Sequence, residues 1–453
     1  MFIPDISGRP GPKFQALADA LAEAIESSEL KANSKLPPQR ILSYRLGVTV
    51  GTITRAYQEL ERRGLTEPKV GSGTYVKDRE AEQQSFYNPI TTRSGIDLAV
   101  CRPLLLSQQH HLSTALQELS LEPVAQKAVL DYYSADGLLG HNQILQQWLS
   151  KKMRSEIDNR RLLWTYGGQH SLTTIIQALT RPSDTILVEG LTYTEFIRTC
   201  QHSERKLVPV RMDDQGIDPD DLELHCKRHK PRLLYLTPAI QNPTGIQLND
   251  SRRLKVIEIC RRYKVMIIED DVLYCPPENR TTPIVTIAPD ITFYVGSFSK
   301  YFAGGLRVGY IVMPLHFKNT IEKALRASCM NISPLMTDLV CRWLRNGAME
   351  AVDNEIAMEL KARHRLFNQY FHQPNPATVP GFNCWLKLPV PLTGYSFSKQ
   401  LSDKGVVVRE AEMFTVGRYP APAAIRISLT GPSSRNELKT GLEIIKNEIQ
   451  RSS

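Results

Sequence analysis

Five short apolar runs recur in the larger, second part of the chain and constrain its fold more than any other feature. Each is bounded by turn residues or charges, and they occupy residues 185–190, 232–238, 265–271, 292–298 and 309–314. Amphipathic helical segments lie between them, for example at 171–180 and 250–263. Strands that alternate with helices predict a mostly parallel sheet covered on both faces. Reactive side chains in such folds gather at the carboxyl ends of the strands.

The first part of the chain predicts three helices instead. Their apolar residues recur at helical spacing: Phe14, Leu17, Leu21, Ala24 and Ile25, then Ile41, Leu42 and Leu46, then Ile53, Ala56, Tyr57 and Leu60. Pro37 and Pro38 are expected just before the second helix begins, and Gly47 is expected to end it because glycine readily adopts the left-handed backbone conformation of a helix C-cap. Thr49 is the expected N-cap of the third helix, which Gly64 ends. The opposite face of that helix carries Gly51, Thr52, Arg55 and Arg62.

A hairpin is predicted directly after the third helix. Residues 65–76 suit two short strands around a turn at Gly71 and Gly73. Helices joined by a tight turn and followed by a hairpin are the layout of a winged helix-turn-helix, whose third helix enters the major groove. Residues 31–77 hold nine Lys and Arg against three acids, most of the excess of 56 basic over 47 acidic residues in the chain. This basic cluster indicates binding to the phosphates of DNA. From the charge alone, a basic face exposed to solvent is the alternative interpretation.

The run LPPQRILSYRLGVTVGTITRAYQELERRGLTEPKVGSGTYV resembles the amino-terminal domain of GntR-family transcription regulators. The resemblance implies double-stranded operator DNA as a partner, and it implies a DNA-facing set of Arg40, Thr49, Thr52, Arg55 and Gly73. The family often has Arg after the capping Ser or Thr, where this chain has Val50 and then Gly51. We therefore expect affinity to depend on Arg40 and Arg55.

The remaining composition gives the domain plan and the compartment. Residues 78–96 are polar and without a helical or strand period, which predicts an exposed linker between a domain at 1–77 and a domain at 97–453. No run of about 18 apolar residues and no signal peptide is present, so we expect a cytoplasmic protein without a membrane span. Eight widely spaced cysteines predict reduced thiols rather than disulfides or a metal site.

Two motifs of the large domain suggest an aldehyde cofactor. In SFSKYFAGGLRVGY, Lys300 follows a strand and could form a Schiff base, while Ser297 and Arg307 could bind a phosphate. In VMIIEDDVLY, acidic residues end an apolar strand and need a partner, which the pyridine nitrogen of pyridoxal 5′-phosphate (PLP) supplies. The alternatives are a surface lysine and an N-cap for the next helix.

Four further motifs fall at similar places. Asn242 in NPTG could donate to the phenolic oxygen of the cofactor, or form part of a plain turn. The glycine pair of WTYGGQHSL precedes a helix whose amides could bind phosphate. Tyr193 could stack on the cofactor ring or belong to the core. Arg426 is a lone arginine in the apolar strand AIRISLT, where a substrate carboxylate or an internal salt bridge would offset its burial.

The order GGQ, TY, NPTG, EDD, SFSK-x6-R and IRIS resembles that of fold-type I PLP-dependent aminotransferases over nearly all of residues 97–453. The resemblance implies Lys300 as the Schiff-base lysine and Arg426 as the site of a substrate or effector carboxylate. The implied cofactor-binding set is Gly168, Gln169, Tyr193, Asn242, Asp270, Ser297, Lys300 and Arg307. Relatives usually place a tyrosine three residues after the aspartate. Here Leu273 stands three residues after Asp270, and Tyr274 stands three after Asp271, so Asp271 is the alternative.

A GntR-type head on an aminotransferase-like body resembles the MocR subgroup of bacterial transcription regulators. The resemblance implies an α+β multidomain homodimer: a winged helix-turn-helix followed by an α/β PLP-dependent fold-type I domain. It implies a regulator that senses an amine, an amino acid or PLP. Such a ligand shifts DNA binding only if it binds two arrangements of the body with different affinity. A working aminotransferase with a regulatory head, and a DNA-binding module on a cofactor-free body, are the alternatives.

Overall fold

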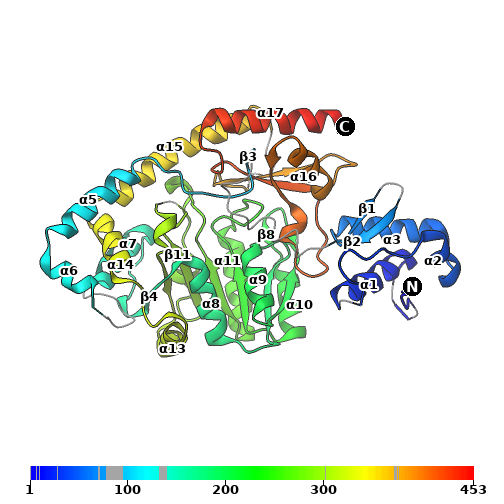
Figure 1. The fold of residues 1–453 in the computed structure, drawn as a ribbon. Helices are drawn as coiled ribbons and strands as arrows, with labels where there is room; N and C mark the ends of the chain where they lie inside the picture. Colours follow the sequence, from blue (N-terminus) through cyan, green and yellow to red (C-terminus); the bar gives the residue numbers. More distant parts are fainter. Residues whose placement is uncertain are drawn as a thin grey trace.

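The computed structural model describes residues 2–452 except 7, 10, 28, 70–71, 78–94, 132–139, 301, 372–374 and 376. The expected linker at 78–96 therefore lies outside the described residues up to residue 94, as does Gly71 of the expected hairpin turn. Strand β3 begins at Ile96, one residue inside that linker, and its first amide donates to the carbonyl of Gly405. In Figure 1 the amino-terminal head, in blue, lies beside a larger body built around one central sheet.

The head has the predicted three helices and hairpin. They are α1 (Lys13–Glu26), α2 (Gln39–Leu46), α3 (Val50–Arg62) and the antiparallel strands β1 (Thr66–Lys69) and β2 (Gly73–Val76). Thr49 caps α3, since its side-chain oxygen accepts the Thr52 amide at 3.2 Å, and Gly47 ends α2 at φ 60°. The predicted apolar faces form the core, except that Ile41 is 47% exposed, whereas Leu42 of the same helix is fully buried and Leu46 packs against the core.

The body is built on a seven-stranded sheet of order β4-β12-β11-β10-β9-β5-β6. Its strands are β4 (Leu162–Thr165), β5 (Thr185–Glu189), β6 (Lys206–Val210), β9 (Leu233–Leu236), β10 (Met266–Asp270), β11 (Thr292–Ser297) and β12 (Gly309–Val312). Each of the five apolar runs forms a strand. Neighbours pair in parallel except that β12 runs antiparallel to both β11 and β4, which confirms the mostly parallel sheet.

Helices cover both faces of this sheet, and the strand side chains alternate between them. Ile186, Val188 and Ile268 pack under α8 (Gly167–Leu179) and α13 (Lys318–Cys329). Leu187 and Ile267 pack on the other face, which is covered by α10 (Pro219–His229), α11 (Asp250–Tyr263) and α12 (Ile284–Ile287).

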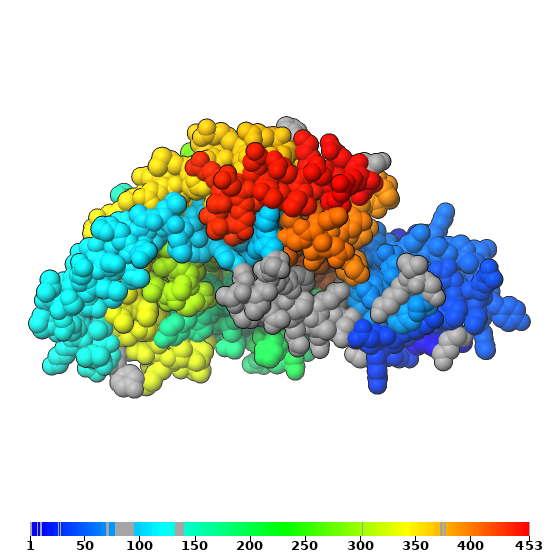
Figure 2. Space-filling model, turned by 45° about the horizontal axis from the view of Figure 1, so that its top comes forward, coloured from blue at the N-terminus to red at the C-terminus, as the bar shows by residue number. Residues whose placement is uncertain are grey.

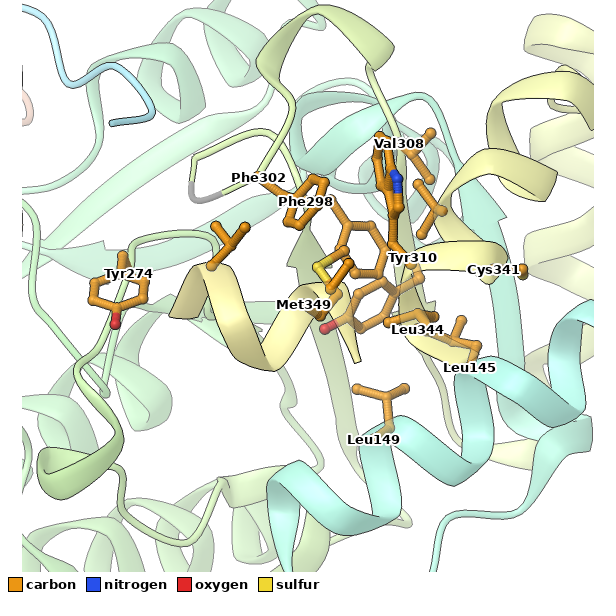
Figure 3. Packing of buried hydrophobic residues seen from close by; sticks show 14 of the residues in the cluster. Leu145, Leu149, Tyr274, Phe298, Phe302, Val308, Tyr310, Cys341, Leu344 and Met349 are labelled. Carbon is orange, nitrogen blue, oxygen red and sulfur yellow. The ribbon is translucent and has the colours of Figure 1, made fainter. Parts of the chain in front are cut away.

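An aromatic cluster closes the β4 end of the sheet. Figure 3 shows Phe298, Phe302 and Tyr310 packed among side chains of the helices that cover this end. Those helices are α7 (His141–Met153), α14 (Pro334–Arg345) and the start of α15 (Ala348–Asn368). The Phe298 and Tyr310 ring centroids are 5.5 Å apart, so the loop that carries Lys300 begins on a packed aromatic base.

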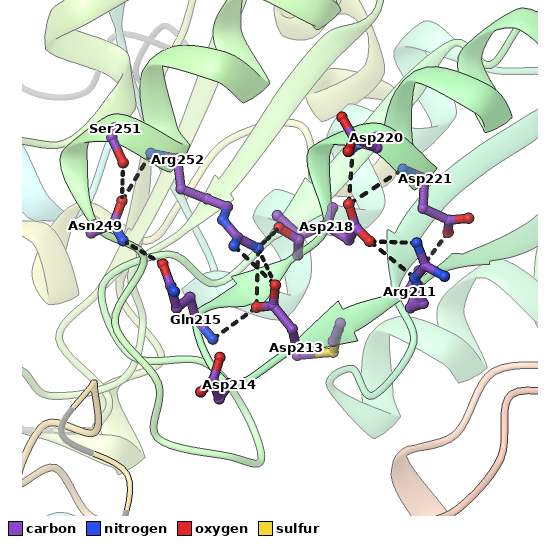
Figure 4. A network of polar contacts seen from close by, with 12 residues as sticks. Arg211, Asp213, Asp214, Gln215, Asp218, Asp220, Asp221, Asn249, Ser251 and Arg252 are labelled. Atoms are coloured by element: carbon purple, nitrogen blue, oxygen red, sulfur yellow. Dashed lines mark hydrogen bonds and ion pairs between the residues drawn. The ribbon is translucent and has the colours of Figure 1, made fainter.

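The loop after β6 is held by ion pairs. It contains the short strands β7 (Met212–Asp213) and β8 (Gly216–Ile217). As Figure 4 shows, Arg252 of α11 pairs with Asp213, and Arg211 pairs with Asp218, the N-cap of α10, at N–O distances of 2.9 and 2.7 Å. These contacts fix the loop against the two helices of this face.

A smaller C-terminal layer lies above the carboxyl ends of the central strands (Figure 1). It contains a three-stranded sheet of order β13-β16-β15 and the pair β14–β3. Its elements are β3 (Ile96–Asp97), β13 (Asn383–Lys387), α16 (Gly394–Asp403), β14 (Val406–Val407), β15 (Arg409–Glu410), η6 (Ala411–Phe414), β16 (Ala424–Ser428) and α17 (Arg435–Ser452), with α9 (Thr194–His202) below it in the large layer.

The head contacts this layer directly. Arg62 of α3 donates to the Ala421 carbonyl at 3.2 Å, and the Tyr395 hydroxyl of α16 donates to Glu67 of β1 at 3.2 Å. The Lys77 amine, at the end of the hairpin, lies over the Tyr395 ring. Arg418 pairs with Glu23 of α1. The head is therefore docked through side chains from α1, α3 and the hairpin.

Helices α5 (Gln108–Ser120) and α6 (Pro123–Val129) extend from the end of the body opposite the head, in cyan in Figures 1 and 2. In the part of the chain that the structure describes, none of the helices is long and apolar enough to cross a membrane. The eight cysteines are free thiols, and seven of them are buried.

Candidate cofactor site and DNA-binding face

A cavity of about 420 Å³ lies between the carboxyl ends of the central strands and the C-terminal layer. It brings together nine side chains or backbone positions that the sequence singled out: Gly168, Gln169, Tyr193, Asn242, Asp270, Ser297, Lys300, Arg307 and Arg426. These residues are spread over more than 250 positions of the chain, and the sheet order places them around one space. The cavity is therefore the candidate site of the body.

Lys300 lies in the loop after β11, and its amine donates to the Cys101 carbonyl at 3.0 Å. Burial lowers the pKa of this amine below its ordinary value, an effect to which the charges of Arg426 and Arg307 add. A lysine in such surroundings is neutral more often than a surface lysine, and the neutral amine is the nucleophile that carbonyl chemistry requires.

The two adjacent aspartates at the end of β10 point to different places. Asp270 lines the cavity and accepts hydrogen bonds from the Tyr235 hydroxyl at 2.7 Å and from the Val272 amide at 3.0 Å. Burial raises the pKa of Asp270 to about 6. Asp271 lies on the opposite side, where Lys152 is 3.3 Å from it and the Tyr294 hydroxyl donates to it.

Tyr274 follows Asp271 away from the cavity. Its hydroxyl donates to the Asp353 carbonyl at 3.0 Å, and its ring stacks on Phe382. The alternative in which Asp271 and Tyr274 serve the site together therefore has no support in the geometry. Tyr235, from the neighbouring strand β9, supplies a phenolic hydroxyl on the cavity side instead.

The end of the cavity beside α8 has an anion-binding form. A Cβ on Gly168 would lie 2.6 Å from Val272, and one on Gly167, at φ 77°, would lie 3.1 Å from the Arg307 guanidinium. Two glycines therefore let the first amides of α8 approach the cavity, where a helix start favours phosphate. Arg307 donates to Ser299 at 3.4 Å.

Two of the expected cofactor-binding side chains have other partners. The Ser297 hydroxyl donates to the Val308 carbonyl at 3.2 Å and accepts the Ser299 amide at 3.1 Å. The Gln169 side chain donates to the Glu195 carbonyl at 3.3 Å. Its Oε1 atom is buried and has no hydrogen-bond partner among the described residues. These contacts fix the loop after β11 and the start of α8.

Asn242 and Arg426 meet at the other end of the cavity. Arg426 donates to the Asn242 side-chain oxygen at 2.9 Å and to the Ala99 carbonyl at 2.7 Å, and its guanidinium lies 5.0 Å from the Phe414 ring centroid. Its Nε atom is buried without a hydrogen-bond partner in the described part of the chain. The alternative, an internal salt bridge of Arg426, is not formed with any described carboxylate, and a donor remains for a ligand.

Sequence reasoning missed several residues that line the cavity. They are Arg198 of α9, Tyr235 of β9, Ser299, Arg409 of β15, and Met413 and Phe414 of η6. A tyrosine within the apolar run RLLYLTP was a signal that could have identified Tyr235. Arg409 gave no such signal, because it lies in a short segment with other charges.

The donor set of this cavity fits PLP. The Lys300 amine matches the aldehyde of the cofactor, and Asp270, which has no cationic partner within ion-pair distance among the described residues, matches the pyridine nitrogen. The start of α8 together with Arg307 matches the phosphate, and the buried Arg426 guanidinium matches an incoming carboxylate.

The residues expected to face DNA lie at the surface of the head. Arg40, Thr49, Arg55 and Gly73 are exposed, and Thr52 is half-buried. The Thr49 and Thr52 hydroxyls are also 2.9 Å apart in the cap of α3. Gly73 has φ 121°, and a Cβ there would lie 2.8 Å from the Lys35 side chain.

Arg62 does not share the outward face of Arg55 as the spacing predicted. It pairs with Glu59 at 2.7 Å and reaches the body at Ala421, because the carboxyl end of α3 packs toward the C-terminal layer.

Comparisons with known proteins agree with both halves. Residues 93–445 match the family Aminotransferase class I and II, and residues 13–76 match Bacterial regulatory proteins, gntR family. The chain is 27% identical over 455 residues to the uncharacterized HTH-type transcriptional regulator YdeF of Bacillus subtilis, covering 98% of this chain and 96% of YdeF. It is 24% identical over 440 residues to the vitamin B6 salvage pathway transcriptional repressor PtsJ of Salmonella typhimurium, covering 94% and 97%.

Solved structures share the fold of the body. The kynurenine aminotransferase of Pyrococcus horikoshii, solved in complex with PMP, superimposes with a TM-score of 0.73 at 21% identity, covering 83% of this chain and 97% of that one. The chain therefore belongs to the aminotransferase class I and II family and carries a GntR winged helix-turn-helix head, which is the organisation of MocR-type transcriptional regulators.

Proposed function

We propose that this protein is a DNA-binding transcriptional regulator that holds PLP in its body and responds to an amine, an amino acid or PLP itself. The single observation that carries the proposal is the convergence of Lys300, Asp270, Arg307 and Arg426 on one cavity in a chain that also has a DNA-binding head. The name of PtsJ, a repressor of vitamin B6 salvage, supports PLP as cofactor or signal. Because bacterial DNA lies in the cytoplasm, the proposal includes a cytoplasmic location.

Each residue of the cavity has a proposed role toward the cofactor. When bound, PLP supplies an aldehyde that reacts with amines and a ring that withdraws electrons. Lys300 would hold it covalently, and Asp270 would keep a proton on the pyridine nitrogen. The remaining roles would be the ring oxygen for Asn242, ring stacking for Tyr193, the phosphate for Gly168, Gln169, Ser297 and Arg307, and an effector carboxylate for Arg426.

A short path of contacts supports transmission from the cavity to the head. Met413 and Phe414 of η6 line the cavity, and their neighbour Glu412 accepts the Tyr395 amide at 3.3 Å. Tyr395 in turn donates to Glu67 and lies under Lys77, both of the head. A ligand that moves η6 would therefore change the docking of the head. The effect requires different ligand affinity in the two arrangements.

A second copy of the chain is the proposed partner of the body. Six large aliphatic side chains of the arm at 105–130 are exposed: Leu105, Leu106, Leu116, Leu121, Val124 and Leu130. Exposed apolar side chains that recur along the loop before α5, in α5 and α6 and at their ends favour a protein interface. We expect Leu121→Asp, at a position that is 82% exposed, to shift the protein from dimer to monomer in sedimentation.

Aminotransferase activity is the alternative function. It is favoured by one observation, the buried Lys300 amine with a lowered pKa, which could also move a proton during turnover. A regulator that only senses would react with an amine once and form no keto acid continuously. Sustained keto-acid production by the purified protein would favour the enzyme.

The proposed function is tested by DNA binding with and without PLP and a panel of amines. We expect the purified protein to take up PLP, to become yellow, and to change its affinity for operator DNA when an amine is added. A protein that stays colourless with excess PLP would overturn the proposal, and an affinity indifferent to PLP and amines would remove the sensing role.

A further inference from the structure

The amino end of α3 presents a short uncharged surface, which we call the tip of α3 and which consists of Val50 and Gly51. Val50, the first residue of the helix, is 43% exposed, and Gly51 is exposed beside it. Arg62, at the other end of the helix, contacts the body and lies about 18 Å from Val50 along the helix axis. In Figure 1, α2, which leads into the tip, lies on the side of the head away from the body. The tip is therefore accessible to a partner of the head.

The threonine hydroxyls around the tip already have partners within the head. Thr49 accepts the amide of Thr52 at 3.2 Å, and the two hydroxyls are 2.9 Å apart. The Thr54 hydroxyl donates to the side-chain oxygen of Gln39 in α2 at 2.8 Å. These hydrogen bonds orient the three threonines, whereas the side chain of Val50 is packed only in part and remains exposed.

The packing of the head does not require glycine at position 51. Gly51 lies within the regular helix and not in the left-handed region of backbone space. Among the described residues, a Cβ there would approach Thr49 Oγ1 at 3.8 Å, which is an ordinary contact. Glycine inside a helix lowers stability relative to alanine. A glycine that the fold does not need, on an exposed helix face, favours the close approach of a partner.

We propose that the tip of α3 reads a thymine of the operator, with Val50 against the C5-methyl group of the base and Gly51 close to the wall of the groove. The inference rests on the proposed function, because it requires the head to bind double-stranded DNA. It adds a base and the two residues that select it. The first residues of a recognition helix contact base edges in the major groove, where thymine presents its methyl group.

The chemistry of the tip favours thymine over the other three bases. Guanine, adenine and cytosine present hydrogen-bond donors and acceptors in the major groove, and a valine side chain can pair with none of them. Covering such a polar edge with Val50 would remove its water without replacing the hydrogen bond, at a cost in affinity. An arginine, which the family often has at this place, would bind guanine through two hydrogen bonds instead.

The experiment first selects operator sequences from a pool of random-sequence double-stranded DNA, using the full-length protein at one salt concentration, with and without PLP. Each thymine of the selected duplex is then replaced in turn by deoxyuridine, which lacks only the C5-methyl group. Fluorescence anisotropy gives the affinities. We expect at least one thymine whose replacement weakens binding by about fourfold, the effect that one buried methyl group predicts.

Variants at position 50 assign this effect to the valine. In Val50→Ala, the difference between the thymine and deoxyuridine duplexes should fall below about twofold, because the contacting methyl groups are removed. Val50→Arg should select guanine in place of that thymine. Val390→Ala, at a valine of the body that is 91% exposed, is the matched control and should keep the parent difference.

A variant at position 51 tests the close approach separately. Gly51→Ala should weaken operator binding by at least about fivefold, because the added Cβ holds the helix away from the groove. Its melting temperature should equal or exceed that of the parent, since alanine is the better helix former. Weaker binding without lower stability distinguishes a DNA contact from a folding defect.

The outcomes separate this inference from the proposed function. Failure to enrich any sequence overturns the proposed function, and this inference with it. A selected operator in which no thymine depends on its methyl group overturns this inference and leaves the proposed function intact. An unchanged deoxyuridine effect in Val50→Ala also overturns it, because another side chain then contacts the methyl group. So does parental binding by Gly51→Ala, since the tip then does not approach the groove closely.

Discussion

The hydroxyl of Tyr235 donates a 2.7 Å hydrogen bond to Oδ2 of Asp270, from one parallel strand to the next. The Phe196 ring stacks on Tyr235 with centroids 3.7 Å apart, so the hydroxyl is held in place. A carboxylate oriented by a neutral donor keeps its charge for another partner. The contact also fixes which of two adjacent aspartates faces the cavity.

Cofactor affinity is the first test of this relationship. We expect Asp270→Asn to weaken PLP binding by at least about tenfold, because an amide cannot hold the proton of the pyridine nitrogen as a carboxylate does. Asp271→Asn, one residue away and directed toward Lys152, is the matched control and should bind PLP nearly as the parent does. Equilibrium dialysis measures the PLP affinity of both variants. An equal loss of affinity in the two would show that Asp270 does not have this role.

The same carboxyl group should give the PLP-free protein a pH dependence. Its pKa is about 6 when folded and near the ordinary 3.8 when unfolded, so the folded state binds the proton more tightly. The contribution of Asp270 to the free energy of unfolding is then fully present below about pH 4. It is lost as the pH rises toward 6, and its size is up to about 3 kcal/mol. Urea unfolding at several pH values should show a smaller fall in Asp270→Asn than in the parent. Identical slopes would contradict the raised pKa.

Lys300→Ala tests the covalent link. Borohydride reduction should fix PLP to the parent protein and not to this variant, because the amine that forms the Schiff base is gone. Operator binding by the head should remain measurable, which serves as the control for folding. A reduced adduct that persists in the variant, located by mass spectrometry, would assign the link to another lysine.

The head should lose DNA affinity when its exposed arginines are removed. We expect Arg55→Ala or Arg40→Ala to weaken operator binding by about tenfold. If the lost contact was to a phosphate, the slope of log affinity against log salt concentration should become shallower by about one. PLP uptake should not change. Arg261→Ala, at a surface ion pair between α11 of the body and Asp290, removes the same charge and should bind DNA as the parent does. Unchanged affinity in both head variants would mean that another face meets DNA.

The contact between head and body gives a test of signal transmission. Tyr395→Phe removes the hydrogen bond to Glu67 and keeps the ring under Lys77. We expect amine binding in the cavity to stay the same, while the effect of that amine on DNA affinity becomes smaller. Tyr370→Phe removes a comparable hydroxyl contact to Glu443 and is the control. A full response in Tyr395→Phe would show that the signal takes another route.

Much of the head could be predicted because its signals are local. Thr49 and Gly47 act within one turn of their own helices, and apolar spacing within each helix identifies the buried face. The predictions that Ile41 belongs to the buried face and that Arg62 shares the outward face of Arg55 were wrong for one reason. Helical spacing does not show how wide the buried face of a helix is, or where the body contacts the head.

The amino-acid sequence by itself determined the two-part plan, the apolar strands of the sheet and the motifs that precede or follow them. It did so because strand and helix periods, caps and turns depend on neighbours in the chain. Only the tertiary structure decided that Asp270 rather than Asp271 faces the cavity, that Tyr235 supports it, and that Arg409 stands opposite Arg426. Alternation relates neighbouring side chains to each other but not to a face, and the register between distant strands is set when the whole sheet packs.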